Sequence, residues 1–470
     1  MAPAQGRPPP PSSTFTLLPT LALACAVLTA SVGACSGDHA SASAEPSSTT
    51  TAPAPPASSS SGAAAQAVTA PAPDPNASPD PKRGAELVVK FECSRCHDGL
   101  DKASPIPLPA KPAEDVTAAN ATKVDNKHCY HCHAAILDGA YKAPKPATTA
   151  RWKKNVEALR DVPTLTGAHQ RFRRSWVLGF LLQPHDLRPR LAPTMPRLAL
   201  TAAEARDIAA FLVPEDAATP ASPPPSAETV REGRELFEKK GCVACHVITG
   251  TAPFKTGAPA KQGERGITPA MRLAPDLRHA RDRMSEGTIV RWIQKPGSIK
   301  KDTLMPETAM TGDEANKIAG FLVGETLAPL EPKKAPARLP VLERHVSYEE
   351  VKVRVFNKIC WHCHSDADYA IGDGGPGNTG GFGFVPRGLN LAAYDGILSG
   401  SLDDKGERRS VFEPMPDGTP RLLAALLSRW TEESGKEDPA IRGMPLGLPA
   451  LSAEDVQLVE SWIAQGHLPD

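Results

Sequence analysis

The sequence is poor in aromatic residues and carries no net charge. Phe, Trp and Tyr make up 5% of its 470 residues, and 53 basic residues balance 53 acidic ones. This balance argues against a nucleic-acid-binding protein that neutralises phosphates. The length suggests about three domains, and aromatic side chains are too few to fill three hydrophobic cores. We therefore expect another apolar group to contribute to these cores.

Proline, by contrast, is abundant, with 50 residues, which is roughly twice ordinary usage. Between residues 40 and 80, 34 of 41 residues are Ala, Ser, Pro or Thr. A segment of this composition cannot bury enough apolar surface to offset the entropy that ordering would cost. We therefore expect residues 35–81 to be a disordered linker.

The start of the sequence has the pattern of a targeting signal. An apolar run at residues 15–34 precedes Cys35, and the four residues ending at Cys35 read VGAC. They resemble the lipobox of bacterial lipoproteins, which implies a signal peptide at 1–34, export, and a lipid anchor on Cys35. An ordinary secretory signal and a transmembrane anchor are the alternatives. Ser36 stands where enterobacterial lipoproteins retained in the inner membrane have Asp, so the resemblance favours the outer membrane, on the periplasmic face of the envelope.

Eight of the ten cysteines form four copies of one motif. In each copy two residues separate the cysteines and a histidine follows at once. Cys-x-x-Cys-His is the attachment motif of c-type haem, in which two thiols bind the vinyl groups of one porphyrin and the imidazole binds its iron. The sequence therefore predicts four covalently bound haem c groups. The motif residues are Cys93, Cys96 and His97; Cys129, Cys132 and His133; Cys242, Cys245 and His246; and Cys360, Cys363 and His364.

Three other uses of paired cysteines explain this pattern less well. Disulfides do not require the histidine after each pair. A four-cysteine zinc site built from the first two pairs would leave His97 and His133 without a role and would not account for pairs in all three regions. A thioredoxin-like redox pair needs a βαβ context, which the sequence lacks. Haem attachment accounts for every residue of the motif.

Three segments, which together cover most of the chain from about residue 82, resemble class I cytochrome c domains of bacteria. The resemblance implies an all-α fold, with three haem domains in tandem joined by Pro-rich linkers. In that family a helix leads into the attachment motif, a later Met closes the sixth iron position, and a C-terminal helix packs against the first. No strand pattern in the sequence is long enough to form a sheet.

The middle segment follows the family pattern most closely. A helix is expected at 228–240, before Cys242, and Pro275 matches the family's Pro whose carbonyl accepts the N–H of the iron-binding histidine. Met305 matches the axial ligand, and Met310 is a poorer candidate because it adjoins the next helix cap. Thr311 and Glu314 predict a capping box for a closing helix at 313–323.

The first segment repeats this plan. Gly84 stands nine residues before Cys93, as Gly233 stands nine before Cys242. Pro163, Trp176 and Met195 correspond to Pro275, Trp292 and Met305, and Thr201 with Glu204 predicts a capped closing helix at 202–213. The departure is the second attachment motif, which lies within the loop.

This arrangement does not decide which of the two haem irons Met195 would bind. The leading helix favours the haem of His97, whereas the spacing to Pro163 and Met195 favours the haem of His133. We prefer the first assignment, after which the other haem needs His169 or His185, or has no strong sixth ligand. A swapped arrangement would use His128 or His131, next to the second motif.

The third segment resembles a cytochrome c variant common in planctomycete proteins. A leading helix is expected at 348–359, and the stretch at 388–391 with Tyr394 falls where that variant has a Leu-x-Leu-x-x-Tyr pattern. Met444 is the preferred axial ligand, because it precedes a closing helix at 453–466 that Ser452 and Asp455 would cap. Met415 is the alternative.

The expected organisation follows from these segments and their composition. We expect a signal peptide, a lipidated linker, a di-haem domain, a linker, a mono-haem domain, a second linker and a second mono-haem domain. Their bounds are 1–34, 35–81, 82–213, 214–226, 227–323, 324–344 and 345–470.

The function expected of such a chain is electron transfer between redox proteins in the periplasm or at the outer membrane, whose identities the sequence does not give. An iron with His and Met ligands in both redox states changes little when it gains an electron. A peroxidase-like enzyme that uses an open second haem is one alternative. The cytochrome subunit of a membrane-bound dehydrogenase is the other.

Overall fold

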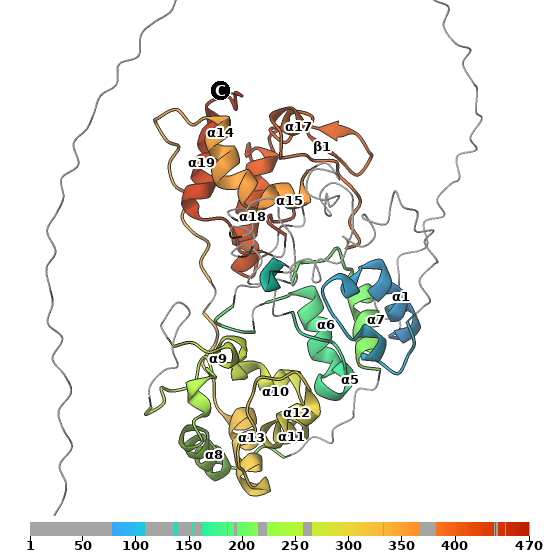
Figure 1. Cartoon of the computed structure of the whole chain (residues 1–470), viewed down its shortest axis with the longest axis vertical. Helices are drawn as coiled ribbons and strands as arrows, with labels where there is room; N and C mark the ends of the chain where they lie inside the picture. The colour runs from blue at the N-terminus through green and yellow to red at the C-terminus, as the bar shows by residue number, and fades with distance from the viewer. Residues whose placement is uncertain are drawn as a thin grey trace, which may run out of the picture. The chain divides into compact units, whose positions relative to one another are not determined.

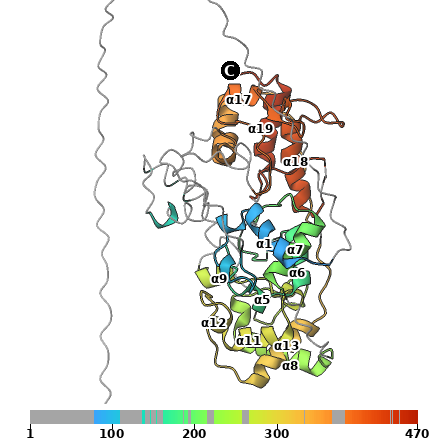
Figure 2. The ribbon, with the colours of Figure 1, turned by 90° about the vertical axis from the view of Figure 1, so that its right-hand side faces the viewer.

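The computed structural model describes residues 78–108, 136–139, 146, 150, 153, 162–185, 187–191, 195–214, 223–256, 266–331, 333–365, 382–436, 438, 440–446 and 448–469. They belong to the unit Pro71–Asp470. Helices dominate this part of the chain (Figures 1 and 2), as expected. Its two-stranded ribbon pairs β1 (Ser401–Leu402) antiparallel with β2 (Arg408–Arg409). No described helix is long and apolar enough to cross a membrane.

The first group of helices is organised around α1 and α7, which pack against each other (Figure 1). Asp80 caps α1 by accepting hydrogen bonds from the amides of Lys82 and Arg83. Thr201 and Glu204 form the expected capping box of α7. The elements are α1 (Pro81–Lys90), η1 (Cys93–Arg95), η2 (Leu100–Lys102), α5 (Ala168–Arg171), α6 (Arg174–Leu182) and α7 (Ala202–Leu212).

The middle group repeats this arrangement with α8 packed on α13. Ser226 caps α8, and Thr311 with Glu314 forms the capping box of α13, as expected. Phe237 of α8 and Phe321 of α13 are fully buried in its core. The elements are α8 (Ala227–Lys239), η4 (Cys242–Ala244), α9 (Pro269–Leu273), η5 (Leu277–His279), α10 (Ala280–Arg283), α11 (Glu286–Gln294), α12 (Pro296–Ile299) and α13 (Gly312–Gly324).

Both helix pairs cross at a glycine. A Cβ atom added to Gly84 would lie 2.0 Å from the carbonyl oxygen of Asp207, and one added to Gly233 would lie 2.0 Å from that of Lys317. The equal spacing of Gly84 and Gly233 from their cysteine motifs therefore reflects one shared requirement, which is that two helix backbones approach closely.

Replacing Gly233 with Ala will lower the free energy of unfolding by about 3 kcal/mol, because the added methyl group can be accommodated only if the helices separate. Gly84→Ala will act in the same way. Gly179, in α6, has nothing within 4 Å of an added Cβ, so Gly179→Ala is the matched control. It should stabilise the protein by about 0.5–1 kcal/mol. Urea unfolding followed by circular dichroism measures all three, and equal effects at Gly233 and Gly179 would contradict the close approach.

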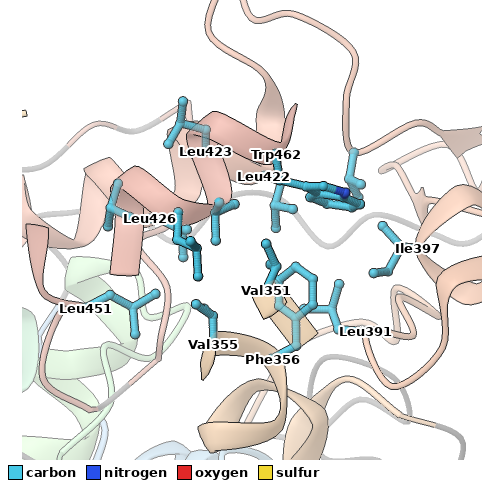
Figure 3. Close-up of a cluster of buried hydrophobic side chains, with 14 of the residues drawn as sticks. Val351, Val355, Phe356, Leu391, Ile397, Leu422, Leu423, Leu426, Leu451 and Trp462 are labelled. Carbon is cyan, nitrogen blue, oxygen red and sulfur yellow. The ribbon is translucent and has the colours of Figure 1, made fainter. Parts of the chain in front are cut away.

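The third group has its own hydrophobic cluster (Figure 3). Val351, Val355 and Phe356 lie on one side of it, and Leu422 and Leu426 of α18 lie on the other. The leading helix expected at 348–359 is present, but most of it is wound as a π-helix, and the closing helix ends two residues before the expected position. The elements are α14 (Tyr348–Val351), η6 (Lys352–Cys360), α15 (Trp361–Cys363), α17 (Tyr394–Leu398), α18 (Arg421–Glu433) and α19 (Ala453–Ala464).

The Pro-rich segment between α13 and α14 is hydrogen-bonded near both ends. The amide of Ala328 donates to the carbonyl of Gly250 at 2.8 Å. The amide of Leu342 donates to Oγ of Ser461 in α19 at 2.9 Å. This connection is therefore held against the helical groups that it joins.

Candidate functional site

The three attachment motifs within the described residues share one main-chain hydrogen bond. The first two are 3-10 turns (η1 and η4), whereas the third continues the helix that leads into it, from η6 to α15. In each, the amide of the histidine donates to the carbonyl of the first cysteine, four residues earlier, so the cysteine and histidine side chains emerge together from one turn. The six cysteines form no disulfide. The N···O distances are 2.9 Å for His97 to Cys93, 3.0 Å for His246 to Cys242 and 2.9 Å for His364 to Cys360.

A main-chain carbonyl orients the imidazole in the first two of these motifs. Nδ1 of His97 lies 2.9 Å from the carbonyl oxygen of Pro163, and Nδ1 of His246 lies 2.9 Å from that of Pro275. The expected role of Pro275 is confirmed, and Pro163 has the same role for His97. With Nδ1 engaged as a donor, Nε2 is the nitrogen left to bind a metal, and the carbonyl raises its basicity.

The loops that supply these carbonyls share one conformation. In each loop a short polar residue follows the residue whose carbonyl faces the histidine. The side-chain oxygen of this polar residue accepts a hydrogen bond from the amide two residues further on, which fixes the turn. The pairs are Thr164 with Thr166 (3.2 Å), Asp276 with Arg278 (2.9 Å) and Asn390 with Ala392 (2.9 Å). The third loop thus repeats the other two, with Leu389 in the place of the proline.

Burial sets the protonation state of the motif side chains. It lowers the pKa of His97 and of His246 and lowers that of His364 to about 4, although a nearby main-chain carbonyl opposes the shift in each case. All three imidazoles are therefore neutral near pH 7, which is the form that binds iron. Burial also raises the pKa of the first thiol of each motif, to about 12 for Cys93, 11 for Cys242 and 12 for Cys360.

One cavity of about 640 Å³ opens onto both the first and the middle of these motifs. Its volume is typical of pockets for organic ligands. Apolar side chains from both helical groups form much of its wall, including Leu100, Ile208 and Leu212 from the first and Phe237, Ile318 and Leu322 from the middle group. Trp176 and Trp292 also line it. Motifs far apart in the sequence therefore face one shared space.

Met195 and Met305, the two methionines that the sequence suggests as axial ligands in the first two segments, both line this cavity. Met195 lines the cavity and packs against the same cluster as Cys93. Met305 and Met310 both line it, and Met310 also packs into the core of the middle group. Met284, which the sequence analysis did not select, is a fourth methionine in the wall.

The third motif has a separate environment. Cys360 and Met444 both pack against the third cluster, together with Leu389 and Tyr394. The amide of Met415, the alternative ligand, donates to the carbonyl of Thr419 in a turn. The structure therefore brings Met444 and the third motif to one core.

The two candidate histidines of the first segment lie in different places. Nδ1 of His169 is 2.9 Å from the carbonyl oxygen of Ala103. His185 is exposed and lines the shared cavity. Its ring is tilted by 50° against that of His279, with centroids 5.1 Å apart. Burial and the charge of His185 lower the pKa of His279.

Several predictions lie outside the described residues. They concern the lipid anchor on Cys35, the whole second motif (Cys129, Cys132 and His133), and the neighbouring His128 and His131.

A group of arginines at and beside the cavity was not predicted from the sequence. Arg171 and Arg190 are each only 3% exposed, and Arg171, Arg188 and Arg283 line the cavity. Burial lowers the pKa of Arg171 and of Arg283 to about 10. No local pattern announces these residues, because the cavity that buries them is assembled from two distant parts of the chain.

Comparison with known proteins identifies the middle segment. Residues 230–324 match the family described as Cytochrome c. This segment is a cytochrome c domain, which binds haem c covalently and transfers electrons through its iron. No curated protein and no solved structure matches the chain.

Proposed function

We propose that this chain is a tetrahaem c-type cytochrome that is tethered to a membrane and carries electrons between redox partners in the cell envelope. The observation that carries the proposal is the repetition of one site. The cytochrome c domain has a turn, a loop carbonyl on the histidine and a methionine nearby. The first segment has the same three features around His97. The third has the main-chain hydrogen bond of the motif and a methionine in the same core around His364, but Nδ1 of His364 has no hydrogen-bond partner among the described residues.

The residues fit haem at each described motif. In each motif two thiols precede a neutral imidazole. The first and middle motifs adjoin the apolar walls of the shared cavity, and Cys360 of the third packs against the third cluster. At the shared cavity, Nε of Arg171 and Nε of Arg283 are buried where carboxylates of haem would pair with them. We assign Cys93, Cys96 and His97; Cys242, Cys245 and His246; and Cys360, Cys363 and His364 to three haems, and Cys129, Cys132 and His133 to a fourth. Bound haem supplies a one-electron iron couple.

Methionines complete the described sites in this proposal. Met195 serves the haem of His97, because it lines the same cavity and packs in the same cluster as Cys93. Met305 serves the haem of His246, and Met444 that of His364. His185 and His169 are the candidates for the haem of His133.

The chain's own residues keep such sites in one geometry. The carbonyls of Pro163 and Pro275 hold the imidazoles in fixed orientation and tautomer. The apolar walls exclude water, so little reorganisation accompanies a change of charge. Lipidation of Cys35 and the linker at 35–81 would keep the carrier near its partners while leaving it free to turn.

Protein-film voltammetry of the haem-loaded protein tests this function. We expect reversible one-electron waves that sum to four electrons per chain, with no added current when hydrogen peroxide is supplied. A catalytic peroxide current would favour the peroxidase-like alternative. Fewer than four electrons, with a matching haem content by mass, would contradict the tetrahaem assignment.

A further inference from the structure

The residues around the shared cavity interlock the first segment with the cytochrome c domain. The amide of Arg173 donates to the carbonyl of Arg283 at 2.8 Å, and its Nε donates to the carbonyl of Met284 at 3.2 Å. In the other direction, the amide of Asp276 donates to the carbonyl of Leu187 at 2.7 Å. Each side therefore holds the main chain of the other.

Arg283 crosses this junction towards the first motif. It lies on α10 of the cytochrome c domain, yet its Cζ is 5.0 Å from the ring centroid of Trp176 and 5.5 Å from that of Phe172. Both rings line the cavity beside the first cluster. Nε of Arg283 is buried and has no hydrogen-bond partner among the described residues.

The charges near Arg283 leave its own charge uncompensated. Besides burial, the influences that lower its pKa are the positive charges of Arg171 and Arg188. Within the described part of the chain it forms no ion pair. A guanidinium whose Nε is buried without a partner favours a nearby negative group. The carboxylates of a haem attached at Cys93 and Cys96 would supply one.

Arg190 makes the reverse contact, from the first segment to the cytochrome c domain. It comes from the first segment and is 3% exposed, and its Nη1 donates to the carbonyl of Cys245 at 2.7 Å and to that of Met271 at 2.8 Å. Cys245 immediately precedes His246.

We propose that the two sites form one unit in which each side supplies a buried guanidinium to the haem of the other, and that these charges raise both reduction potentials. The proposal rests on the proposed function. Oxidised haem carries one more positive charge than reduced haem, so a nearby guanidinium favours the reduced form. Arg283 acts on the haem of His97, and Arg190 acts on that of His246. Both are positioning residues.

The test measures the potential of each haem in variants of the full holoprotein. Arg283→Gln should lower the reduction equilibrium constant of the haem at His97 about tenfold, which is a shift of about 59 mV for one electron. Arg190→Gln should do the same to the haem at His246. Nuclear Overhauser contacts from haem protons to Trp176 or Trp292 identify which haem has moved.

Charge and packing are separated by further variants. Arg283→Lys keeps the charge and should restore most of the potential. Arg281 lies on the same helix, bonds to the carbonyl of Glu325 at 2.8 Å and does not line the cavity, so Arg281→Gln should leave both potentials unchanged. Since Arg190 bonds two carbonyls, Arg283 is the decisive position if Arg190→Gln unfolds.

Two results would overturn the crossed arrangement. One is a folded Arg283→Gln protein in which the haem near Trp176 keeps its potential. The other is an equal shift in Arg283→Lys and Arg283→Gln, which would indicate packing alone. If the unmodified protein shows no reversible haem waves, the proposed function itself fails. If it shows four waves but the arginine variants do not shift the potentials as expected, only the crossed arrangement fails.

Discussion

Replacing Cys242 and Cys245 together with Ala will yield a protein with three haems, in which α8 and α13 exchange their amide hydrogens much faster. Phe237 of α8 and Ile318 of α13 line the cavity. Without a cofactor held covalently at Cys242 and Cys245, these apolar side chains lose the apolar group that would cover them. Because apolar burial stabilises this helix pair, the pair should open locally well below the global unfolding energy.

The matched control is the same double substitution at Cys129 and Cys132. That protein should also contain three haems, but α8 and α13 should keep their protection. Haem content by intact mass and hydrogen exchange of peptides from 227–323 distinguish the two proteins. Four haems in the Cys242/Cys245 variant, or equal loss of protection in both variants, would contradict the account of this pocket.

Replacing Met305 with Ala will open one iron to carbon monoxide, which should bind rapidly to the reduced protein at one equivalent per chain. A thioether that closes the sixth position also raises the potential, so the same variant should show one haem with a lower potential. Flash photolysis measures the binding, and voltammetry measures the potential.

Met310→Ala is the control for this prediction, because Met310 lines the same cavity and packs into the core. It should lower stability without opening an iron. Rapid binding to Met310→Ala but not to Met305→Ala would exchange the roles of the two methionines.

The parts of the structure that depend on neighbouring residues were predictable from the sequence. The capping box of Thr311 and Glu314 spans four residues, and the closing helix that it predicts is present. The contact between His246 and the carbonyl of Pro275, 29 residues later, was predictable because the family it resembles uses a proline carbonyl in this way. The equal spacing of Gly84 and Gly233 from their motifs was visible in the sequence. Only the structure shows that each glycine lets the backbone of a second helix approach closely.

The parts that depend on distant contacts were not predictable. Arg283 and Arg190 look like ordinary surface charges in the sequence. The cavity that Arg283 lines, and the carbonyls that Arg190 binds, come together with these residues only when two segments meet. The π-winding of 352–360 has the same apolar pattern as an α-helix over so short a stretch. The junction between the first segment and the cytochrome c domain was likewise missed, because its main-chain hydrogen bonds leave no residue pattern.

The most direct test of the account is carbon monoxide binding to the unmodified, fully reduced holoprotein, scored as equivalents bound rapidly per chain. If the chain is an electron carrier with every iron closed by a protein ligand, essentially none will bind. The haem of His133 then has a strong sixth ligand, for which His185 and His169 are the candidates. Rapid binding of one equivalent would contradict the account, since an open iron indicates an enzyme or a sensor.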